Sequence, residues 1–447
     1  MRFWEQEANK RSTKINNRTL CSTQSAFLPS FDSFELVLCF ASSVVLLLCG
    51  CVCRAALEDD GRWHISSAED MAEWFNTEQG QFESSDAVLD ADIDFAKEPA
   101  KPLGATSDGT CVVFSGTFDG NNHTIKGLVI NNASTGNAGL FCSLGNATVK
   151  NVVFDDQCLF DGMFAGSVSG EAVDGDAVVV WNVHTKATVR CTTRCGGLVG
   201  SVAGTVGSLT VSHCTNTGSV TGEADSGSVF VGGFVGWSNG GSVLIEHNTN
   251  NATITCSSDY CACGGLFGLA GSETSVTVSH NTNNGAITTA STSSSFAGGL
   301  GGFCSNVVST NNTNNANVRA SGYNARAGGM CGTVAYGSMN EFWNCTNNGN
   351  ITATGDQGRC VAGGIVGWCM TSTTITDCMN TGTITSTTTT ATTRARRWTR
   401  RAERRGDGGD GGAAEAPDRR AGAGAFAQAA RRGAPAAPVI DALFLVC

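Results

Sequence analysis

Acidic side chains that could cleave a glycan lie at scattered positions in the central part of this 447-residue chain. Cleavage of a glycosidic bond needs two carboxyl groups that face one groove. The cluster of Asp155, Asp156 and Asp161 is the place to look for such a pair, although acids on a solvated loop are the simpler interpretation. Between Cys195 and Ser386 the acids are Glu223, Asp225, Glu246, Asp259, Glu273, Glu341, Asp356 and Asp377, and the bases are Arg319, Arg326 and Arg359. We therefore predict no catalytic residues.

Two groups of residues have spacings that could attract a metal ion: His213, His247 and His280, and Asp90, Asp92 and Asp94. Each histidine stands three residues before a recurring asparagine, but a flat ladder of imidazoles does not close a tetrahedral zinc site. The aspartates share one face of an expected strand over residues 89–95, yet Phe95 stands where a calcium loop needs glycine. No H-E-x-x-H, phosphate-loop, G-x-S-x-G or dinucleotide motif occurs. We expect no metal and no cofactor.

Cysteine is unusually frequent, with fifteen residues from Cys111 to Cys378. Such usage is typical of an oxidising compartment, where disulfides persist. Cys345 and Cys378 stand at the same point of adjacent repeats, so we predict a disulfide between them. Cys261 and Cys263 are too close for an easy mutual bridge and lack the partners of a zinc site.

Sequons for N-glycosylation support export, although a chain rich in Asn and Thr also produces them by chance. The acceptors are Asn122, Asn132, Asn146, Asn251, Asn311, Asn344 and Asn350.

These residues are positioned by a unit that is written six times between Cys195 and Ser386. Each unit opens with a glycine pair and reaches a turn asparagine; successive asparagines are 34, 33, 31, 33 and 33 residues apart. The turn asparagines are Asn216, Asn250, Asn283, Asn314, Asn347 and Asn380. The glycine pairs are Gly196 and Gly197, Gly232 and Gly233, Gly264 and Gly265, Gly298 and Gly299, Gly328 and Gly329, and Gly363 and Gly364. A fixed period of this length indicates a solenoid, in which each coil packs on its neighbours.

The repeats predict an all-β, right-handed parallel β-helix with two or three short strands per coil. Val211, Ile245 and Val278 lie five residues before the turn asparagine, and Val220 and the residues equivalent to it lie four residues after it. Stacking brings equivalent positions to about 4.8 Å from one another, so aliphatic columns fill the interior and asparagine amides bond between coils. Paired glycines are expected to allow positive φ and close backbone approach. A propeller needs longer units and fits poorly.

Residues 1–35 are polar and basic, and residues 36–53 carry no charge. The apolar segment is either a transmembrane signal anchor or a cleaved signal peptide, and both place the rest of the chain outside the cytoplasm. Residues 57–190 then form an N-terminal cap and the first coils. Within them, residues 63–75 predict a short helix with a capping box at Ser66 and Glu69.

Together, the expected helix, the strand over residues 89–95, the stretch Phe114–Leu128 and the repeated Gly-Gly-Leu-Val-Gly resemble GLUG-motif surface proteins. That resemblance covers about residues 63–386. It implies a β-helix displayed outside the cell in a passive or adhesive role. Some relatives are IgA-cleaving metallopeptidases whose chemistry lies in a separate domain, and this chain lacks that domain's motif.

From residue 387 to 447 the sequence changes to Thr, Arg, Gly and Ala, typical of a disordered or mistranslated tail; a basic tail that grips anions is the alternative. Residues 191–386 thus hold the six repeats. The formal net charge of −11 argues against nucleic acid as a partner. We expect a non-catalytic surface scaffold whose ligand is a glycan or a protein on a host or neighbouring cell, tethered through residues 36–53. The alternative is a lyase or glycoside hydrolase on the same fold.

Overall fold

The computed structural model describes residues 56–57, 59–76, 83–337, 339–355 and 359–388. The expected basic region over residues 1–35, the apolar segment 36–53 and residues 389–447 of the expected tail lie outside this part of the chain. Among the described residues, none of the helices has the length and apolar character needed to cross a bilayer.

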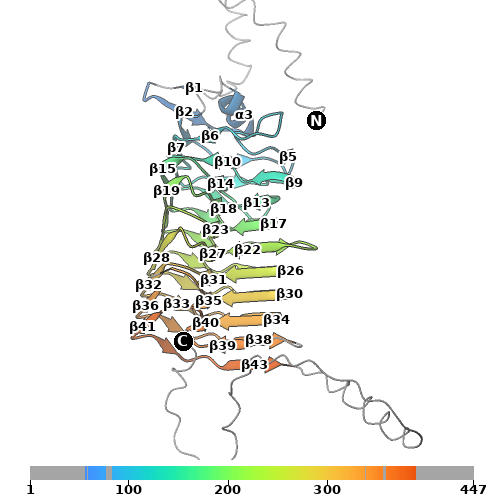
Figure 1. The fold of residues 1–447 in the computed structure, drawn as a ribbon. Coiled ribbons are helices and arrows are strands. Elements are labelled where there is room, and N and C mark those ends of the chain that lie inside the picture. Colours follow the sequence, from blue (N-terminus) through green and yellow to red (C-terminus); the bar gives the residue numbers. More distant parts are fainter. Residues whose placement is uncertain (1–55, 58, 77–82, 338, 356–358, 389–447) are drawn as a thin grey trace, which may run out of the picture. The chain divides into compact units, whose positions relative to one another are not determined.

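The described residues form a parallel β-solenoid whose coils each pass through four sheets, A, B, C and D, in that order (Figure 1). Nine strands in sheet D correspond to nine coils that pass through all four sheets. Four strands per coil exceed the two or three expected from the sequence, because sheet B contributes only two or three residues per coil and these carry little periodicity. All strand pairs are parallel except β1 with β2.

Sheets A and B form one half of each coil. Sheet A contains β1 (Ala56–Leu57), β2 (Arg62–Ile65), β3 (Asp86–Leu89), β7 (Thr117–Asp119), β11 (Thr148–Lys150), β15 (Gly175–Trp181), β19 (Val206–Ser212), β24 (Ser242–Glu246), β28 (Ser275–Ser279), β32 (Val307–Thr310), β36 (Glu341–Trp343) and β41 (Thr374–Thr376). Sheet B contains β4 (Ile93–Asp94), β8 (Thr124–Lys126), β12 (Val153–Phe154), β16 (His184–Thr185), β20 (Thr215–Asn216), β25 (Thr249–Asn250), β29 (Thr282–Asn283), β33 (Thr313–Asn314), β37 (Thr346–Asn347) and β42 (Met379–Asn380).

Sheets C and D form the other half. Sheet C contains β5 (Pro99–Ala100), β9 (Val129–Ala138), β13 (Leu159–Ala165), β17 (Thr188–Gly196), β21 (Ser219–Glu223), β22 (Ser228–Gly232), β26 (Thr253–Gly264), β30 (Ile287–Gly298), β34 (Val318–Gly328), β38 (Ile351–Gly355), β39 (Val361–Gly363) and β43 (Ile384–Thr388). Sheet D contains β6 (Val113–Phe114), β10 (Phe141–Leu144), β14 (Ser169–Ala172), β18 (Val199–Val202), β23 (Val235–Ser238), β27 (Phe267–Ala270), β31 (Gly301–Cys304), β35 (Cys331–Val334) and β40 (Val366–Cys369).

The aliphatic columns predicted from the repeat fill the interior. Val211, Ile245 and Val278 pair in register along sheet A, and each is fully buried. The column from Val220 through Ile254 runs in register along sheet C. Each fully buried aliphatic side chain contributes roughly 1.5 to 3 kcal/mol of burial. Stacking of like residues therefore holds the coils together, as the period predicts.

The N-terminal end is closed by helix α3 (Ala68–Asn76), which is shorter than the helix expected over residues 63–75, because the preceding residues pair as β2 with β3. The capping pair is also displaced by one residue. The backbone N–H of Asp70 donates to Ser67 Oγ (3.1 Å), and the Asp70 carboxylate accepts from the backbone N–H of Ser66 (3.0 Å). The Trp74 ring covers the first coil, with ring centroids 5.7 Å from Phe114 and 5.9 Å from Phe118.

The single strand expected over residues 89–95 is instead a corner between β3 and β4. Its aspartates have separate protein partners rather than a shared cation. Asp90 contacts His64 (2.9 Å), Asp92 accepts from Lys126 Nζ (2.7 Å), and Asp94 accepts from the backbone N–H of Ala96 (2.7 Å). The hydrogen bond from Lys126 is the main cause that lowers the pKa of Asp92 to about 2.

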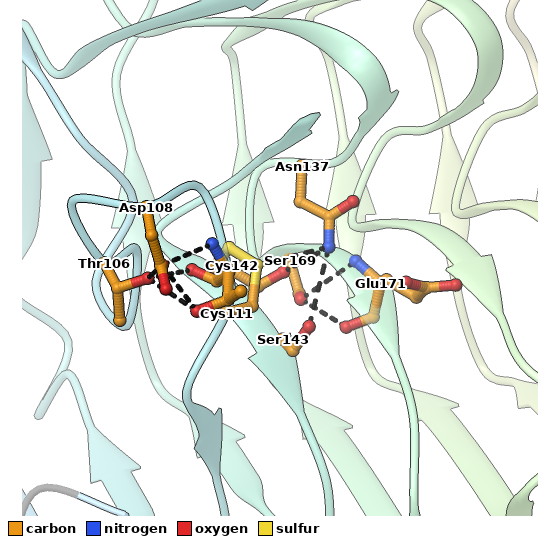
Figure 2. Close-up of a disulfide and its surroundings, with 9 residues drawn as sticks. Thr106, Asp108, Cys111, Asn137, Cys142, Ser143, Ser169 and Glu171 are labelled. Carbon is orange, nitrogen blue, oxygen red and sulfur yellow. Dashed lines mark hydrogen bonds between the residues drawn. A yellow bond between two sulfur atoms is a disulfide. The ribbon is translucent and has the colours of Figure 1, made fainter. Parts of the chain in front are cut away.

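Eight of the fifteen cysteines form disulfides: Cys111–Cys142, Cys191–Cys195, Cys256–Cys261 and Cys304–Cys331. The first fastens the loop before β6 to β10, with a Cα–Cα distance of 5.6 Å (Figure 2).

The predicted Cys345–Cys378 disulfide is wrong for this structure, in which both residues are free thiols. In-register stacking keeps the two Cβ atoms about a rung apart, beyond the usual Cβ separation of a disulfide. Each thiol instead contacts the backbone: the N–H of Cys345 donates to Cys378 Sγ (3.4 Å).

Candidate functional site

Two columns of outward-facing side chains meet along the corner between sheets C and D, and we call them together the aromatic–arginine stripe. The sheet C column is Phe164, Arg194, Phe230, Ala262, Phe296, Arg326 and Val361. The sheet D column is Glu171, Ser201, Trp237, Leu269, Phe303, Thr333 and Trp368. Residues of the sheet C column alternate with buried core positions such as Cys195 and Val231, so their side chains point away from the core.

The repeated glycine pairs bring these two columns together. A Cβ on Gly233 would collide with the backbone oxygen of Gly265 and with the Asn250 side chain. None of the described repeat glycines has a positive φ, so the expectation of left-handed backbone there is wrong. The pairs are needed for close approach alone, because neighbouring coils and the turn asparagines pack against the corner where a side chain would stand.

The turn asparagines line the inner side of that corner as a buried ladder. Asn250 Nδ2 donates to Asn283 Oδ1 (2.8 Å), and Asn283 Nδ2 donates to Asn314 Oδ1 (2.7 Å). The ladder continues through Asn347 to Asn380, with donor–acceptor distances of 2.7 and 2.6 Å. Asn216 stands on the rung before Asn250 and donates instead to the backbone oxygen of Gly233 (2.8 Å). The ladder has a structural role, because its amide groups form hydrogen bonds with one another and with the backbone of the turns.

The first repeated feature of the stripe is an arginine held between two aromatic rings of neighbouring coils. The guanidinium of Arg194 lies 4.6 Å from the Phe164 ring centroid and 3.7 Å from that of Trp237. Arg194 Nη1 donates to Ser201 Oγ (2.9 Å), and Ser201 Oγ donates to Glu171 Oε1 (3.5 Å). We call Phe164, Arg194 and Trp237 the first unit. Figure 2 shows Glu171 on β14 beside Ser169 and Asn137.

The same arrangement recurs in Phe296, Arg326 and Trp368, which we call the second unit. The Arg326 guanidinium lies 5.1 Å from each of the two ring centroids. Arg359 adds a second guanidinium 5.8 Å from the Trp368 centroid. Cation–π contacts of this kind are worth about 0.5 to 2 kcal/mol each.

Aromatic rings connect the coils between the units. The ring centroids of Phe230 and Tyr260 are 6.1 Å apart, and those of Tyr260 and Phe296 are 5.1 Å apart. Phe303 continues the series at 5.8 Å from Phe296 and 6.3 Å from Tyr336, which is 62% exposed. Aromatic rings, most of them packed edge to face, therefore follow the solenoid axis along one side.

Four buried side-chain atoms lack a hydrogen-bond partner within the described part of the chain: Arg194 Nε, Arg326 Nε, Thr333 Oγ1 and Trp368 Nε1. All four lie on the aromatic–arginine stripe. Buried polar groups in native proteins are nearly always paired, and each exception needs an explanation. Their gathering on one surface marks the stripe as the candidate binding site.

Burial also affects the charged groups of the stripe. It raises the pKa of Glu171, an effect that the nearby Arg194 opposes. It lowers the pKa of Arg194 and of Arg326, and the charge of Arg359 lowers the pKa of Arg326 further. The stripe therefore holds charged groups whose hydration is reduced, and reduced hydration strengthens electrostatic interactions.

The histidine candidates form a stack rather than a closed site. His213 and His247 have ring centroids 5.2 Å apart, and His247 and His280 are 4.9 Å apart. Each has a φ between 55° and 57°, and the same left-handed corner is occupied by Asn311, Asn344 and Asp377 in later coils. Asn, Asp and His are the non-glycine residues that adopt this conformation most readily, which explains their shared position.

The acids of the cluster upstream of the repeats have separate surroundings. Asp155 Oδ1 accepts from the backbone N–H groups of Gly127 and Gln157, both at 3.1 Å, so this carboxylate stabilises turns. Asp161 lies on β13 in register with Arg190, and burial raises its pKa. Asp156 is exposed.

The sequon asparagines lie on the surface of several sheets. Asn122, Asn146, Asn251, Asn344 and Asn350 are exposed, whereas Asn132 and Asn311 are half-buried. Their glycosylation stays a prediction.

A surface cavity of about 480 Å³ lies on sheet C and is lined by none of the stripe residues. Several of its side chains have partners: Thr292 Oγ1 donates to Asp259 Oδ1 (2.6 Å), and Ser258 Oγ donates to the backbone oxygen of Gly227 (2.8 Å). None of the buried unpartnered atoms of the described residues lies in its lining.

The stripe was missed in the sequence, although a signal for it exists. Arg194, Phe230, Phe296 and Arg326 each stand two residues before a glycine pair, and Trp237 and Trp368 stand five residues after the first glycine of theirs. Sorting the aromatic and basic residues by repeat position would have found it. Arg326 shares the repeat position of Arg194, which lies just outside the stretch from Cys195 to Ser386.

Comparison with known proteins adds little. No family model and no curated protein matches the chain. Among solved structures, the chain is similar to the crystal structure of a "putative immunoglobulin A1 protease" from Bacteroides ovatus, at 17% identity, over 74% of this chain and 84% of that one, with a TM-score of 0.35. A similarity this low carries no argument about function.

Proposed function

We propose that this protein is a non-catalytic cell-surface or secreted β-solenoid that binds an extended ligand along the aromatic–arginine stripe and so serves in adhesion. The observation that carries the proposal is the gathering of all four unpartnered buried polar atoms of the described residues on that stripe. A line of planar rings with polar groups between them suits a glycan chain, whose sugar rings have apolar faces and hydroxyl edges.

Display outside the cytoplasm is part of the proposal. Four disulfides are typical of an oxidising compartment. The exposed sequons, the uncharged segment over residues 36–53 and the resemblance to GLUG-motif surface proteins point the same way. A right-handed winding and a membrane tether through residues 36–53 belong to the same proposal.

A polysaccharide lyase or glycoside hydrolase is the second candidate, and one observation favours it. Glu171 lies on the stripe with a pKa raised by burial, which is the condition of a general acid in glycan cleavage. Glu171 is, however, the one carboxylate of the two stripe columns, whereas cleavage needs a pair. The binding role therefore has the stronger support.

Incubation of the full-length protein with a glycan array and a panel of soluble polysaccharides tests both candidates. We expect retention of at least one polysaccharide without release of soluble products. Release of oligosaccharides that stops in Glu171→Gln would support the enzyme. If no glycan binds, the proposal of a glycan ligand fails. If glycans bind and the stripe variant Trp237→Ala binds each of them as tightly as the parent does, the stripe is not the binding surface.

A further inference from the structure

The two units of the stripe provide an internal comparison. Arg194 and Arg326 occupy the same column four coils apart, and so do Trp237 and Trp368. At about 4.8 Å per coil, the units are separated by roughly 19 Å along the axis. In each, an arginine lies between a phenylalanine of the preceding coil and a tryptophan of the following coil.

The two units differ in the group that balances the positive charge of the arginine. In the first unit, Arg194 donates to Ser201, which in turn donates to the carboxylate of Glu171. In the second unit, the position equivalent to Glu171 is Phe303 and that of Ser201 is Thr333. Among the described residues, the first unit therefore carries its own anion, and the second does not.

The second unit is left with positive charge and unpartnered donors. Arg326 Nε, Thr333 Oγ1 and Trp368 Nε1 are buried without a partner in the described residues, against Arg194 Nε alone in the first unit. Arg359 brings a second guanidinium to the same tryptophan. An unpaired buried polar group costs about 1 to 3 kcal/mol, and more when it is charged. An anion beside Arg326 and Arg359 would balance the charged part of this cost.

We propose that the second unit is a subsite for the acidic group, carboxylate or sulfate, of an anionic polysaccharide. This inference rests on the proposed function, since it names the ligand of the same stripe. The acidic group accepts hydrogen bonds from the guanidinium groups of Arg326 and Arg359 and so balances their charge, as Glu171 balances that of Arg194 in the first unit. Sugar rings on either side pack against Phe303 and Tyr336.

The charge of the chain favours a polysaccharide over a nucleic acid. The formal net charge of −11 opposes the approach of a polymer with a charge on every residue. One cationic subsite on an otherwise aromatic surface suits a polymer whose acidic groups are separated by neutral ring surface. Binding is therefore expected to weaken with salt, yet less steeply than nucleic-acid binding does.

The test uses hyaluronate, which has a carboxylate on every second sugar, and the same polymer after methyl esterification, which removes the charge and keeps the backbone. Kappa-carrageenan, with one sulfate per two sugars, and its desulfated form make a second pair that distinguishes sulfate from carboxylate. We expect the full-length protein to bind one charged polymer at least about 10-fold more tightly than its neutral form, which corresponds to one charge-assisted hydrogen bond or more.

Two reciprocal substitutions separate the units. Phe303→Glu supplies the second unit with the carboxylate that the first already has, so it should abolish the preference for the charged polymer. Arg326→Gln should abolish the same preference, whereas the matched variant Arg194→Gln should retain it. Circular dichroism and melting curves establish whether each variant folds. If Arg326→Gln does not fold, Phe303→Glu alone tests the acidic subsite.

The outcomes distinguish this inference from the proposed function. Equal binding of charged and neutral forms, with loss of both in Trp237→Ala, would overturn the acidic subsite and leave the glycan-binding stripe standing. Absence of binding to any polysaccharide would refute both. Tighter binding of single-stranded DNA or polyaspartate than of either charged polysaccharide, lost in Arg326→Gln, would overturn the choice of polysaccharide.

Discussion

Replacing Asn283 by alanine tests whether the buried asparagine ladder holds the coils together. The side chain is fully buried, and its Oδ1 accepts from Asn250 Nδ2 (2.8 Å). Its Nδ2 donates to Asn314 Oδ1 (2.7 Å) and to the backbone oxygen of Gly285 (3.2 Å). At about 0.5 to 1.5 kcal/mol per net hydrogen bond, three lost bonds cost roughly 2 to 4 kcal/mol, because the partners stay buried and unpaired.

The chain offers a matched control in a second, exposed ladder. Asn315 Nδ2 donates to Asn284 Oδ1 (2.8 Å), and Asn348 Nδ2 donates to Asn315 Oδ1 (2.8 Å), so the geometry is alike. Water replaces these partners when Asn315 is changed to alanine, and the expected cost is less than about 1 kcal/mol. Burial is thus the main variable that differs between Asn283→Ala and Asn315→Ala.

Amide hydrogen exchange is the suitable assay, because a solenoid can open coil by coil and a single unfolding free energy can mislead. Exchange at Thr282 and its neighbours should quicken about 10-fold or more in Asn283→Ala, and urea should unfold that variant first. Equal protection in the two variants would refute the reasoning that burial gives the ladder its strength.

Three further predictions concern packing and ionisation. Gly265→Ala should destabilise the fold far more than an exposed glycine such as Gly109, because its Cβ would meet the Gly299 backbone oxygen and Asn283, whereas Gly109, at a positive φ, has open space; urea unfolding compares them. Because the pKa of Asp92 is lowered in the folded state, the stabilisation from this carboxylate is present above its ordinary pKa and is lost as the pH falls toward 2. In Asp92→Asn, acid unfolding should begin at the same pH, but the free energy of unfolding should depend slightly less on pH. The effect should be under about 1 kcal/mol, because the Asp92–Lys126 pair is exposed. Burial raises the pKa of Cys214 to about 12, so a thiol reagent should label half-buried Cys360 first and Cys214 only on unfolding, as mass spectrometry would show.

The repeat predicted the columns because identical residues at a near-constant period must stack. Asn283 and its equivalents, and the aliphatic residues around them, followed directly from the sequence. The displaced helix cap did not, because Ser66 and Ser67 are equally good cap residues, and only the pairing of β2 with β3 decides between them. Local propensity proposes such ends, and tertiary pairing sets them.

The prediction of a Cys345–Cys378 disulfide failed because the repeat period does not show in which direction each side chain points. These cysteines continue a buried column in which Asn248, Asn281 and Asn312 direct their side-chain oxygens to the backbone N–H of the preceding coil, at 2.7 to 2.9 Å. Cys378 Sγ takes the same role toward Cys345. Shared position predicts proximity, whereas side-chain direction decides bonding.

The same distinction explains where a ligand-binding surface can arise in a solenoid. Positions that pack against the next coil are restricted to one residue type: at Gly265 a side chain collides with the coil below, and at Asn283 an apolar side chain leaves two amides unpaired. At the position two residues before the glycine pair, the side chain points outward, and coil stacking does not require a particular residue type. This chain carries Arg, Phe, Ala, Phe, Arg and Val there in successive coils. Coil stacking does not require an arginine between two rings, so its recurrence four coils later, with the balancing carboxylate exchanged for Phe303, supports the proposed ligand-binding role of the stripe.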